Sequence, residues 1–153
     1  MRVERHTGPR SELRHLFEEA EDSPEQLDAY VDDGIVLVAR DDDGRIVGHL
    51  QLDDGEIKNM AVEPARRGTG VGRELIRAAI ELARSQGRSA LTVATAAADV
   101  GNLRFYQRAG FRMRAIERDA FTPETGYPAD LRSDGIPVRD RVWLDMELAC
   151  AAS

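Results

Sequence analysis

The sequence has very little cysteine and no long apolar run. Its only cysteine, Cys150, stands almost at the C-terminus, so no disulfide can form within the chain. No segment is long and apolar enough to span a bilayer. The first ten residues are polar and lack the apolar core of a signal peptide. These absences predict a cytoplasmic protein that makes no contact with a membrane.

Net positive charge is also missing. The 153 residues carry 21 Lys and Arg against 28 Asp and Glu, which gives a formal charge of −7. Nucleic-acid binding needs a basic surface, so this balance argues against a nucleic-acid partner. The hydrophobic fraction of 42% and the charged fraction of 32% are those of a globular protein. The length predicts one domain over residues 1–153.

The first half of the sequence predicts strands and two short helices. Residues 3–7 form a candidate strand, Ser11 can cap a first helix, and Ser23 followed by Pro24 can cap a second. Turn signals at Asp43-Gly44 and Asp54-Gly55 then separate three strands of an antiparallel meander. These strands are predicted at Ile35–Arg40, Arg45–Leu52 and Glu56–Val62.

The second half mixes helices and strands. Helical spacing predicts helices over Gly70–Gln86 and Asn102–Ala109, each with a glycine after its end. Strands are predicted at Ser89–Thr95, Phe111–Ile116 and Arg141–Leu148. Residues 118–140 have no clear periodicity, and so long a structureless stretch is either functional or partly misread. The order of elements indicates an α/β or α+β domain, a mixed sheet with helices on its faces.

A glycine-rich loop, residues 66–73, joins a strand to the N-terminus of an amphipathic helix. Gly68, Gly70 and Gly72 let the backbone curl with its N–H groups turned inward. The first helical turn and the helix dipole favour a bound anion there. Arginines add local positive charge within an acidic chain. The loop therefore predicts a pyrophosphate site.

Two nucleotide-binding motifs fail on the residues of this loop. A Walker A loop needs Lys and then Ser or Thr after its last glycine, but Gly72 is followed by Arg73 and Glu74. A Rossmann fingerprint needs a glycine at position 73 and a strand that begins a parallel βαβ unit, whereas this strand follows a meander. A plain glycine turn remains the structural alternative, which the arginines and the three alternating glycines disfavour.

Two motifs resemble the GNAT N-acetyltransferase superfamily. Arg67–Gly72 fits its Arg/Gln-x-x-Gly-x-Gly/Ala signature, and follows a strand that ends as in the family, Asn59–Pro64. Gly101–Phe111 resembles the second motif, in which Asn, Phe-Tyr and Gly-Phe recur at these intervals. The resemblance covers Glu56–Phe111 and implies a GNAT-like fold. Its mixed, mostly antiparallel sheet would be flanked by helices and splayed between the central strands Glu56–Val62 and Ser89–Thr95.

The resemblance also implies acetyl-CoA as co-substrate, and no metal. Backbone groups of Met60, Ala61 and Val62 would bind the pantetheine arm, which Asn102 would also contact. Arg104 or Arg108 could meet the 3′-phosphate of the coenzyme. The residues whose amides would hold the pyrophosphate are Arg67, Gly68, Thr69, Gly70, Val71, Gly72 and Arg73.

By resemblance, Tyr106 is the candidate general acid. It lies four residues after Asn102, hence on the same stripe of the helix, and would protonate the departing thiolate. The alternative is a packing role. Glu56, at the start of the central strand, would remove the amine proton through water, although a solvated carboxylate is an equal interpretation. Other candidates for the base are His49, Asp130 and Asp134.

The acceptor side has no signature of its own. Residues 121–128 and 134–140 resemble a C-terminal extension in a bacterial branch of the family. We expect it to fold over the acceptor, with Phe121 and Tyr127 as walls and Glu124 or Arg139 as polar contacts. A structural crossing or a subunit interface is the alternative. Residues 11–33 would supply the opposite wall.

The sequence thus predicts an acetyl-CoA-dependent N-acetyltransferase, an acyltransferase that acetylates a primary amine of a small molecule by direct attack in a ternary complex. No covalent enzyme intermediate is required, because Cys150 lies outside both motifs. A protein or peptide N-acetyltransferase and a non-catalytic acyl-CoA-binding module remain alternatives. The resemblance also allows a homodimer.

Overall fold

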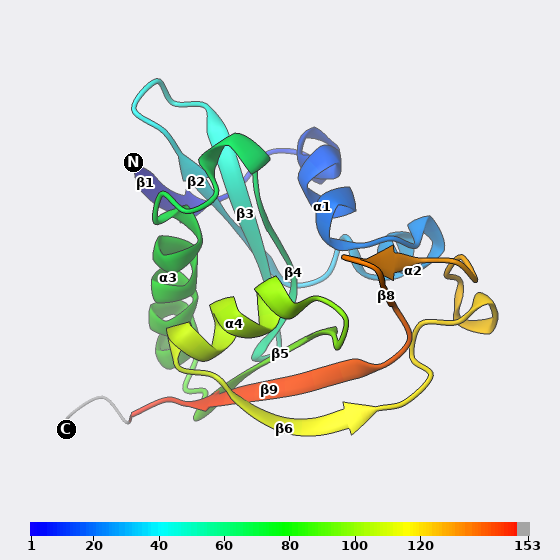
Figure 1. Cartoon of the computed structure of the whole chain (residues 1–153). Helices are drawn as coiled ribbons and strands as arrows, with labels where there is room; N and C mark the ends of the chain where they lie inside the picture. Colours follow the sequence, from blue (N-terminus) through cyan, green and yellow to red (C-terminus); the bar gives the residue numbers. More distant parts are fainter. Residues whose placement is uncertain (150–153) are drawn as a thin grey trace.

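A seven-stranded sheet organises the computed structural model, which describes residues 1–149. Cys150 lies outside the described residues. The strand order is β1-β2-β3-β4-β5-β9-β6, and all neighbours run antiparallel except β4 and β5 (Figure 1). The strands are β1 (Arg2–Arg5), β2 (Ile35–Arg40), β3 (Ile46–Asp53), β4 (Glu56–Val62), β5 (Ala90–Ala96), β6 (Arg112–Glu117) and β9 (Arg141–Glu147). The predicted mixed α/β fold is confirmed.

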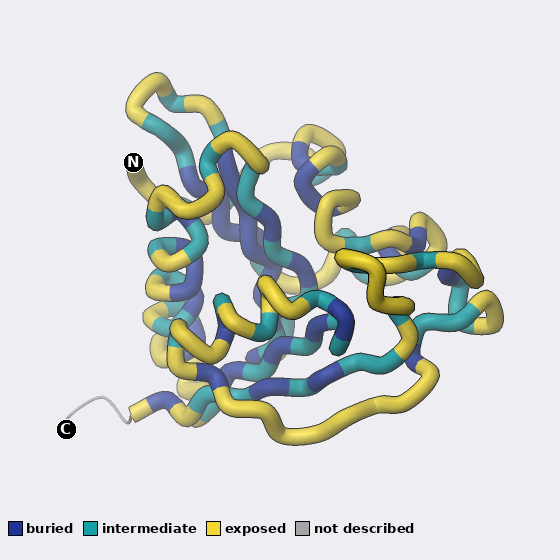
Figure 2. The backbone as a smooth tube through the Cα atoms, in the orientation of Figure 1, coloured by how far each residue is buried: buried dark blue, intermediate teal, exposed yellow. Residues whose placement is uncertain are grey.

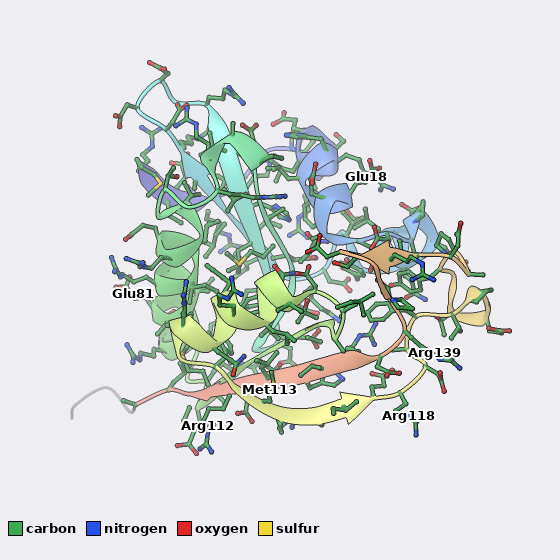
Figure 3. All side chains as sticks on the ribbon, viewed as in Figure 1. Glu18, Glu81, Arg112, Met113, Arg118 and Arg139 are labelled. Atoms are coloured by element: carbon green, nitrogen blue, oxygen red, sulfur yellow. The ribbon has the colours of Figure 1, made fainter. Side chains whose placement is uncertain are left out.

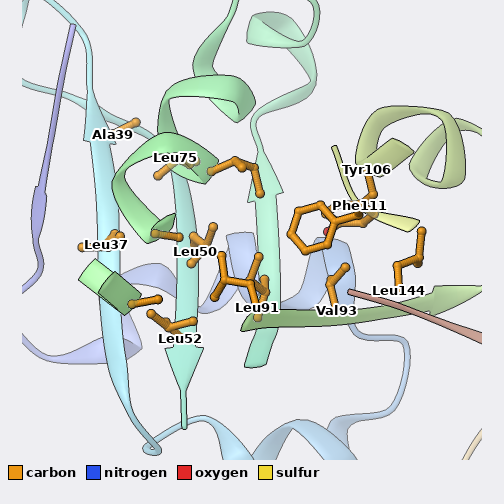
Figure 4. Close-up of a cluster of buried hydrophobic side chains, with 14 of the residues drawn as sticks. Leu37, Ala39, Leu50, Leu52, Leu75, Leu91, Val93, Tyr106, Phe111 and Leu144 are labelled. Atoms are coloured by element: carbon orange, nitrogen blue, oxygen red, sulfur yellow. The ribbon is translucent and has the colours of Figure 1, made fainter. Parts of the chain in front are cut away.

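Helices cover both faces of this sheet: α1 (Arg14–Ala20), α2 (Pro24–Tyr30), α3 (Val71–Ser85) and α4 (Val100–Ala109). Leu75 of α3 packs in the larger core cluster with Leu37 of β2 (Figure 4). Phe17 of α1 packs in a second cluster with Val36 and Val38. Successive residues of β2 therefore face opposite layers, as the two-residue period of a strand requires. Figure 2 shows the sheet segments between the helices in dark blue, the colour of buried residues. Within residues 1–149, no helix is long and apolar enough to cross a membrane.

The central strands β4 and β5 pair over only two positions. Glu56 lies opposite Thr92 and Ile57 lies opposite Val93, after which the two strands separate. The rest of β4 pairs with β3 alone, so its other edge is left without a strand partner in the described chain. This edge opens toward α4, and the predicted splay between the central strands is confirmed.

The predicted helix starts have different outcomes. The Ser23 hydroxyl accepts a hydrogen bond from the Gln26 amide at 3.2 Å and caps α2 as expected. Ser11 does not cap a helix, because a 3₁₀ turn over Arg10–Leu13 precedes α1. Leu13 and Leu16 are each only 1% exposed, and burying both overrides the local cap preference of the serine.

Residues 118–140, here called the strap, are not structureless. They contain a 3₁₀ turn at Pro123–Thr125 and a small hairpin of β7 (Arg132–Ser133) and β8 (Ile136–Pro137). Two-residue strands carry no readable period, which is why the sequence missed them. The strap crosses beside α2, where the Gln26 side chain donates to the Thr125 carbonyl at 2.9 Å (Figure 1).

Candidate active site

Two cavities meet in the opening between β4 and β5. The wide cavity, about 510 Å³, extends from the start of β4 to α2 and the strap. The loop cavity, about 440 Å³, extends from the end of β4 to the glycine-rich loop and α4. The residues that line both are Glu19, Ala20, Met60, Asp99, Asn102 and Tyr106. A ligand in one cavity can therefore touch a ligand in the other at this junction.

The glycine-rich loop has the conformation of an anion cradle. Gly68 and Gly70 have φ of +75° and +93°, the left-handed region that favours glycine. Gly70 is the N-cap of α3, and in the described chain the amides of residues 68–73 donate to no backbone carbonyl. Such free amides at a helix start can bind an anion.

Arginines border this loop on both sides. Arg73 of α3 and Arg104 and Arg108 of α4 line a groove of about 640 Å³ that continues over Gly68, Gly70 and Gly72. Arg67 also lies on the loop cavity, 3.5 Å from a carboxylate oxygen of Glu19. The groove thus carries the positive charge that the sequence predicted for a phosphate site.

Three predicted coenzyme contacts lie along the open edge of β4. Met60, Ala61 and Val62 all line the loop cavity. Their backbone groups on this side have no partner strand among the described residues. Asn102 faces them from the first turn of α4, and its side-chain nitrogen donates to Thr95 Oγ1 at 3.3 Å.

Tyr106 is held rigidly between two aromatic rings. Its ring meets those of Phe105 and Phe111 edge to face, with centroids 5.3 and 5.7 Å apart. The residue is only 6% exposed, yet it lines both cavities. Burial, and then the charge of Asp99, raise the pKa of the Tyr106 hydroxyl, so it stays protonated.

Glu56 lines the wide cavity from the first position of β4. The residue is half-buried, and burial raises the pKa of its carboxyl group. Lys58, whose nitrogen lies 3.9 Å away, and Arg141 act in the opposite direction. A carboxylate with a raised pKa is a better proton acceptor than an ordinary one.

The other candidate bases lie away from these cavities. His49 is fully buried under the Phe17 ring, with centroids 4.3 Å apart, and its Nε2 lies 2.8 Å from Asn59 Oδ1. Burial lowers the pKa of His49 to about 4. Asp130 and Asp134 are exposed and line neither cavity.

The strap forms one wall of the wide cavity. Phe121 and Tyr127 both line it, with ring centroids 5.0 Å apart. The Tyr127 hydroxyl donates to Glu21 Oε2 at 2.8 Å and so ties the strap to the turn before α2. Glu124 and Arg139, expected as polar contacts, do not line the cavity, because both are exposed on the outside of the strap.

Four further residues line this cavity: Glu21, Tyr30, Asp99 and Arg141. Glu21 and Tyr30 belong to residues 11–33, the segment predicted as the opposite wall, but sequence reasoning named neither of them as a contact. Asp99 had a readable signal, since it caps α4 by accepting from the Asn102 amide at 2.9 Å. The other three are brought together only by tertiary structure.

Comparison with known proteins identifies the class. Residues 4–111 match the Acetyltransferase (GNAT) family, and the chain belongs to this family. The uncharacterized N-acetyltransferase YvbK of Bacillus subtilis is 30% identical over 152 residues, which cover 97% of each chain.

Solved structures agree over nearly the whole chain. A Bacillus subtilis acetyltransferase in complex with CoA has a TM-score of 0.86 at 31% identity, with 97% of this chain and 99% of that one covered. A GNAT family acetyltransferase from Elizabethkingia anophelis with acetyl-CoA bound has a TM-score of 0.85 at 30% identity, with 96% and 97% covered.

Proposed function

We propose that this protein transfers the acetyl group of acetyl-CoA to a primary amine of a small molecule, by direct attack in a ternary complex. The observation that carries the proposal is the junction at Tyr106, where a cavity beside an anion cradle meets a second, separate cavity. CoA and acetyl-CoA in the two related structures support the choice of donor.

The donor would lie in the loop cavity. The free amides of residues 68–73 would hold its pyrophosphate, and Arg104 or Arg108 the 3′-phosphate. The open edge of β4 from Met60 to Val62 would pair with the pantetheine amides like an added strand. Asn102 would contact the same arm. Together these contacts would direct the thioester toward Tyr106.

The acceptor would react from the wide cavity. Glu56, through water, would take a proton from the ammonium, because a protonated amine is not a nucleophile. Attack on the thioester carbonyl gives a tetrahedral oxyanion that a backbone N–H of β4 can stabilise. Tyr106, kept protonated by burial, would then donate its proton to the departing CoA thiolate.

Two features favour a small amine over a protein acceptor. The strap lies over the wide cavity and is tied down by the bond from Tyr127 to Glu21. Its volume of about 510 Å³ lies in the range of small-molecule pockets. Asp22 and Asp99 also line it, and their negative charge suits a positively charged amine.

Acetyl-CoA binding and acetyl transfer to amines are tested together. Acetyl-CoA should raise the Tm of the purified protein, and a panel of small amines should release free CoA thiol with at least one member. Peptides with free N-termini or lysines form a parallel arm. Absence of any thermal shift with acetyl-CoA would sink the proposal, while a shift without thiol release from any acceptor would favour the non-catalytic binding module.

We further propose that residues 1–153 form one domain and that the protein is cytoplasmic. A homodimer is an open alternative to a monomer. Light scattering of the purified protein over a range of concentrations would decide the last of these.

A further inference from the structure

Arg141 presents a guanidinium group to the wide cavity. It begins β9 and lies against aromatic rings, with its Cζ atom 4.9 Å from the centroid of Phe121 and 5.9 Å from that of Trp143. All three residues line the wide cavity. Stacking on aromatic faces fixes the plane of a guanidinium and leaves its edge free for other partners.

Most of the donors of this group are unused. Nη1 donates to Glu117 Oε1 at 3.1 Å, and this is the only hydrogen bond of the guanidinium within residues 1–149. Glu117 also accepts from Trp143 Nε1 at 3.2 Å, and its side chain is 46% exposed. Nε and Nη2 of Arg141 thus have no protein acceptor, although only 27% of the side chain is exposed.

The charge of Arg141 reaches across the cavity. It lowers the pKa of Glu56, and also that of the Tyr30 and Tyr127 hydroxyls, against the larger effect of burial. Three groups on different elements therefore sense one cation. A fixed, partly desolvated guanidinium with free donors matches the planar geometry of a carboxylate.

We propose that Arg141 binds a carboxylate of the acceptor, so that the substrate is an amino acid or a similar small amine that carries a carboxylate. This rests on the proposed function and adds the substrate class. The carboxylates of Asp22 and Asp99 line the same cavity, and Asp99, which also caps α4, belongs to its junction with the loop cavity. One cavity thus offers partners to both charges of a zwitterion.

The coenzyme does not account for this cation. Arg141 lines the wide cavity and not the loop cavity or the arginine-bordered groove that continues from it. The phosphates of a bound CoA would lie at the glycine-rich loop. Glu117 pairs with one edge of the guanidinium, so an anion at the donors that remain free would belong to the second substrate.

Matched acceptor pairs test the inference. Each pair is an amino acid and the amine left by its decarboxylation, such as phenylalanine and 2-phenylethylamine or alanine and ethylamine. We expect higher kcat/KM for the amino acid. Arg141→Gln should lower kcat/KM for the amino acid by about tenfold to a hundredfold, mainly through KM, because a charge-assisted hydrogen bond is lost. The amine without a carboxylate should be affected by about twofold at most.

Two further variants serve as controls. Arg141→Lys keeps the charge without the planar fork and should lie between wild type and Arg141→Gln. Arg139→Gln removes an arginine two residues earlier that pairs with Asp119 on the outer surface (Figure 3). This variant should leave kcat/KM unchanged for both members of each acceptor pair. Calorimetric titration of the amino acid into the protein–CoA complex adds a readout without turnover.

The outcomes separate this inference from the proposed function. The carboxylate site is wrong if Arg141→Gln lowers kcat/KM equally for the amino acid and for its decarboxylated amine. It is also wrong if wild type and Arg141→Gln bind the amino acid equally well, even when amines are acetylated. If acetyl-CoA does not bind at all, the proposed function itself fails. In that case the amino acid is titrated into the protein alone, and binding that is weakened in Arg141→Gln but not in Arg139→Gln still supports the carboxylate site.

Discussion

Gly72 of α3 lies so close to the Phe105 ring of α4 that a side chain at position 72 would be tightly packed against it. A Cβ atom added at Gly72 would lie 3.0 Å from both Cε1 and Cζ of the Phe105 ring. Helix α3, whose N-terminus belongs to the anion cradle, is therefore in direct contact with helix α4, which carries Tyr106. A side chain at position 72 would therefore push against the Phe105 ring, which lies next to the proposed general acid in the sequence of α4.

Gly72→Val should disturb that contact. Overpacking of this kind typically costs about 1–3 kcal/mol, so we expect a lower free energy of unfolding and weaker binding of acetyl-CoA. Urea denaturation and calorimetric titration measure the two effects. The double variant Gly72→Val/Phe105→Leu should recover part of both losses. Strict additivity in this double-mutant cycle would show that the two residues do not compete for space.

Tyr106→Phe isolates the proposed acid. Loss of a general acid typically lowers turnover by about a hundredfold or more, whereas the affinity for acetyl-CoA should change little. Thiol release gives kcat, and calorimetric titration gives the affinity. Tyr127→Phe removes the strap hydroxyl that bonds to Glu21 and is the matched control for hydroxyl loss. Unchanged turnover in Tyr106→Phe would refute the acid role.

Glu56→Gln should alter the pH dependence of the reaction. A base must be ionised, so kcat/KM should rise with pH through a pKa above the usual Glu value of 4.5, because burial raises it. Glu56→Gln should lower the rate and remove this limb. Lys58→Met should move the limb to higher pH, since the charge of Lys58 lowers the pKa of Glu56.

Stability gives an independent check on the same carboxyl group. A raised pKa means that the folded state disfavours the charged carboxylate. The stability that the neutral carboxyl group contributes at low pH is therefore lost as pH rises through the folded pKa. Glu56→Gln should therefore be more stable than wild type at neutral pH, and this difference should shrink as pH falls. Glu81→Gln, on the outer surface of α3, should show no such trend (Figure 3). A pH-independent difference would contradict the assignment.

The sequence predicted those parts of the site whose chemistry depends on the backbone. Gly68 and Gly70 do take left-handed conformations, and the glycine-rich loop does precede a helix. Turn residues likewise placed the meander. Such features are local, because one short segment contains everything that determines them.

The acceptor side depends on contacts that no local pattern records. Tyr127 and Glu21 bond across 106 positions of the chain, and Arg141 reaches Phe121 only because β9 lies beside the strap. The strap itself carries no clear periodicity in the sequence. The docking of the strap on α2 decides which of its residues face the cavity. Sequence alone therefore gives no reason to choose Arg141 over Glu124 or Arg139 as a polar contact.

His49 supplies a final prediction, on pH and stability. Its pKa is lowered by burial from 6.5 to about 4, so the unfolded chain takes up a proton more readily than the folded one. The stability due to neutral His49 is complete above pH 6.5 and is lost as pH falls toward 4. The slope should be about 1.4 kcal/mol per pH unit. Urea denaturation at several pH values measures it.

His49→Gln should flatten this dependence, because glutamine can still donate to Asn59 and does not titrate. His6→Gln, at a partly exposed position, is the control and should leave the slope unchanged. The same variant decides between the candidate bases. Retained thiol release in His49→Gln leaves Glu56 as the base, whereas a large loss of turnover without a loss of stability would assign the proton transfer to His49.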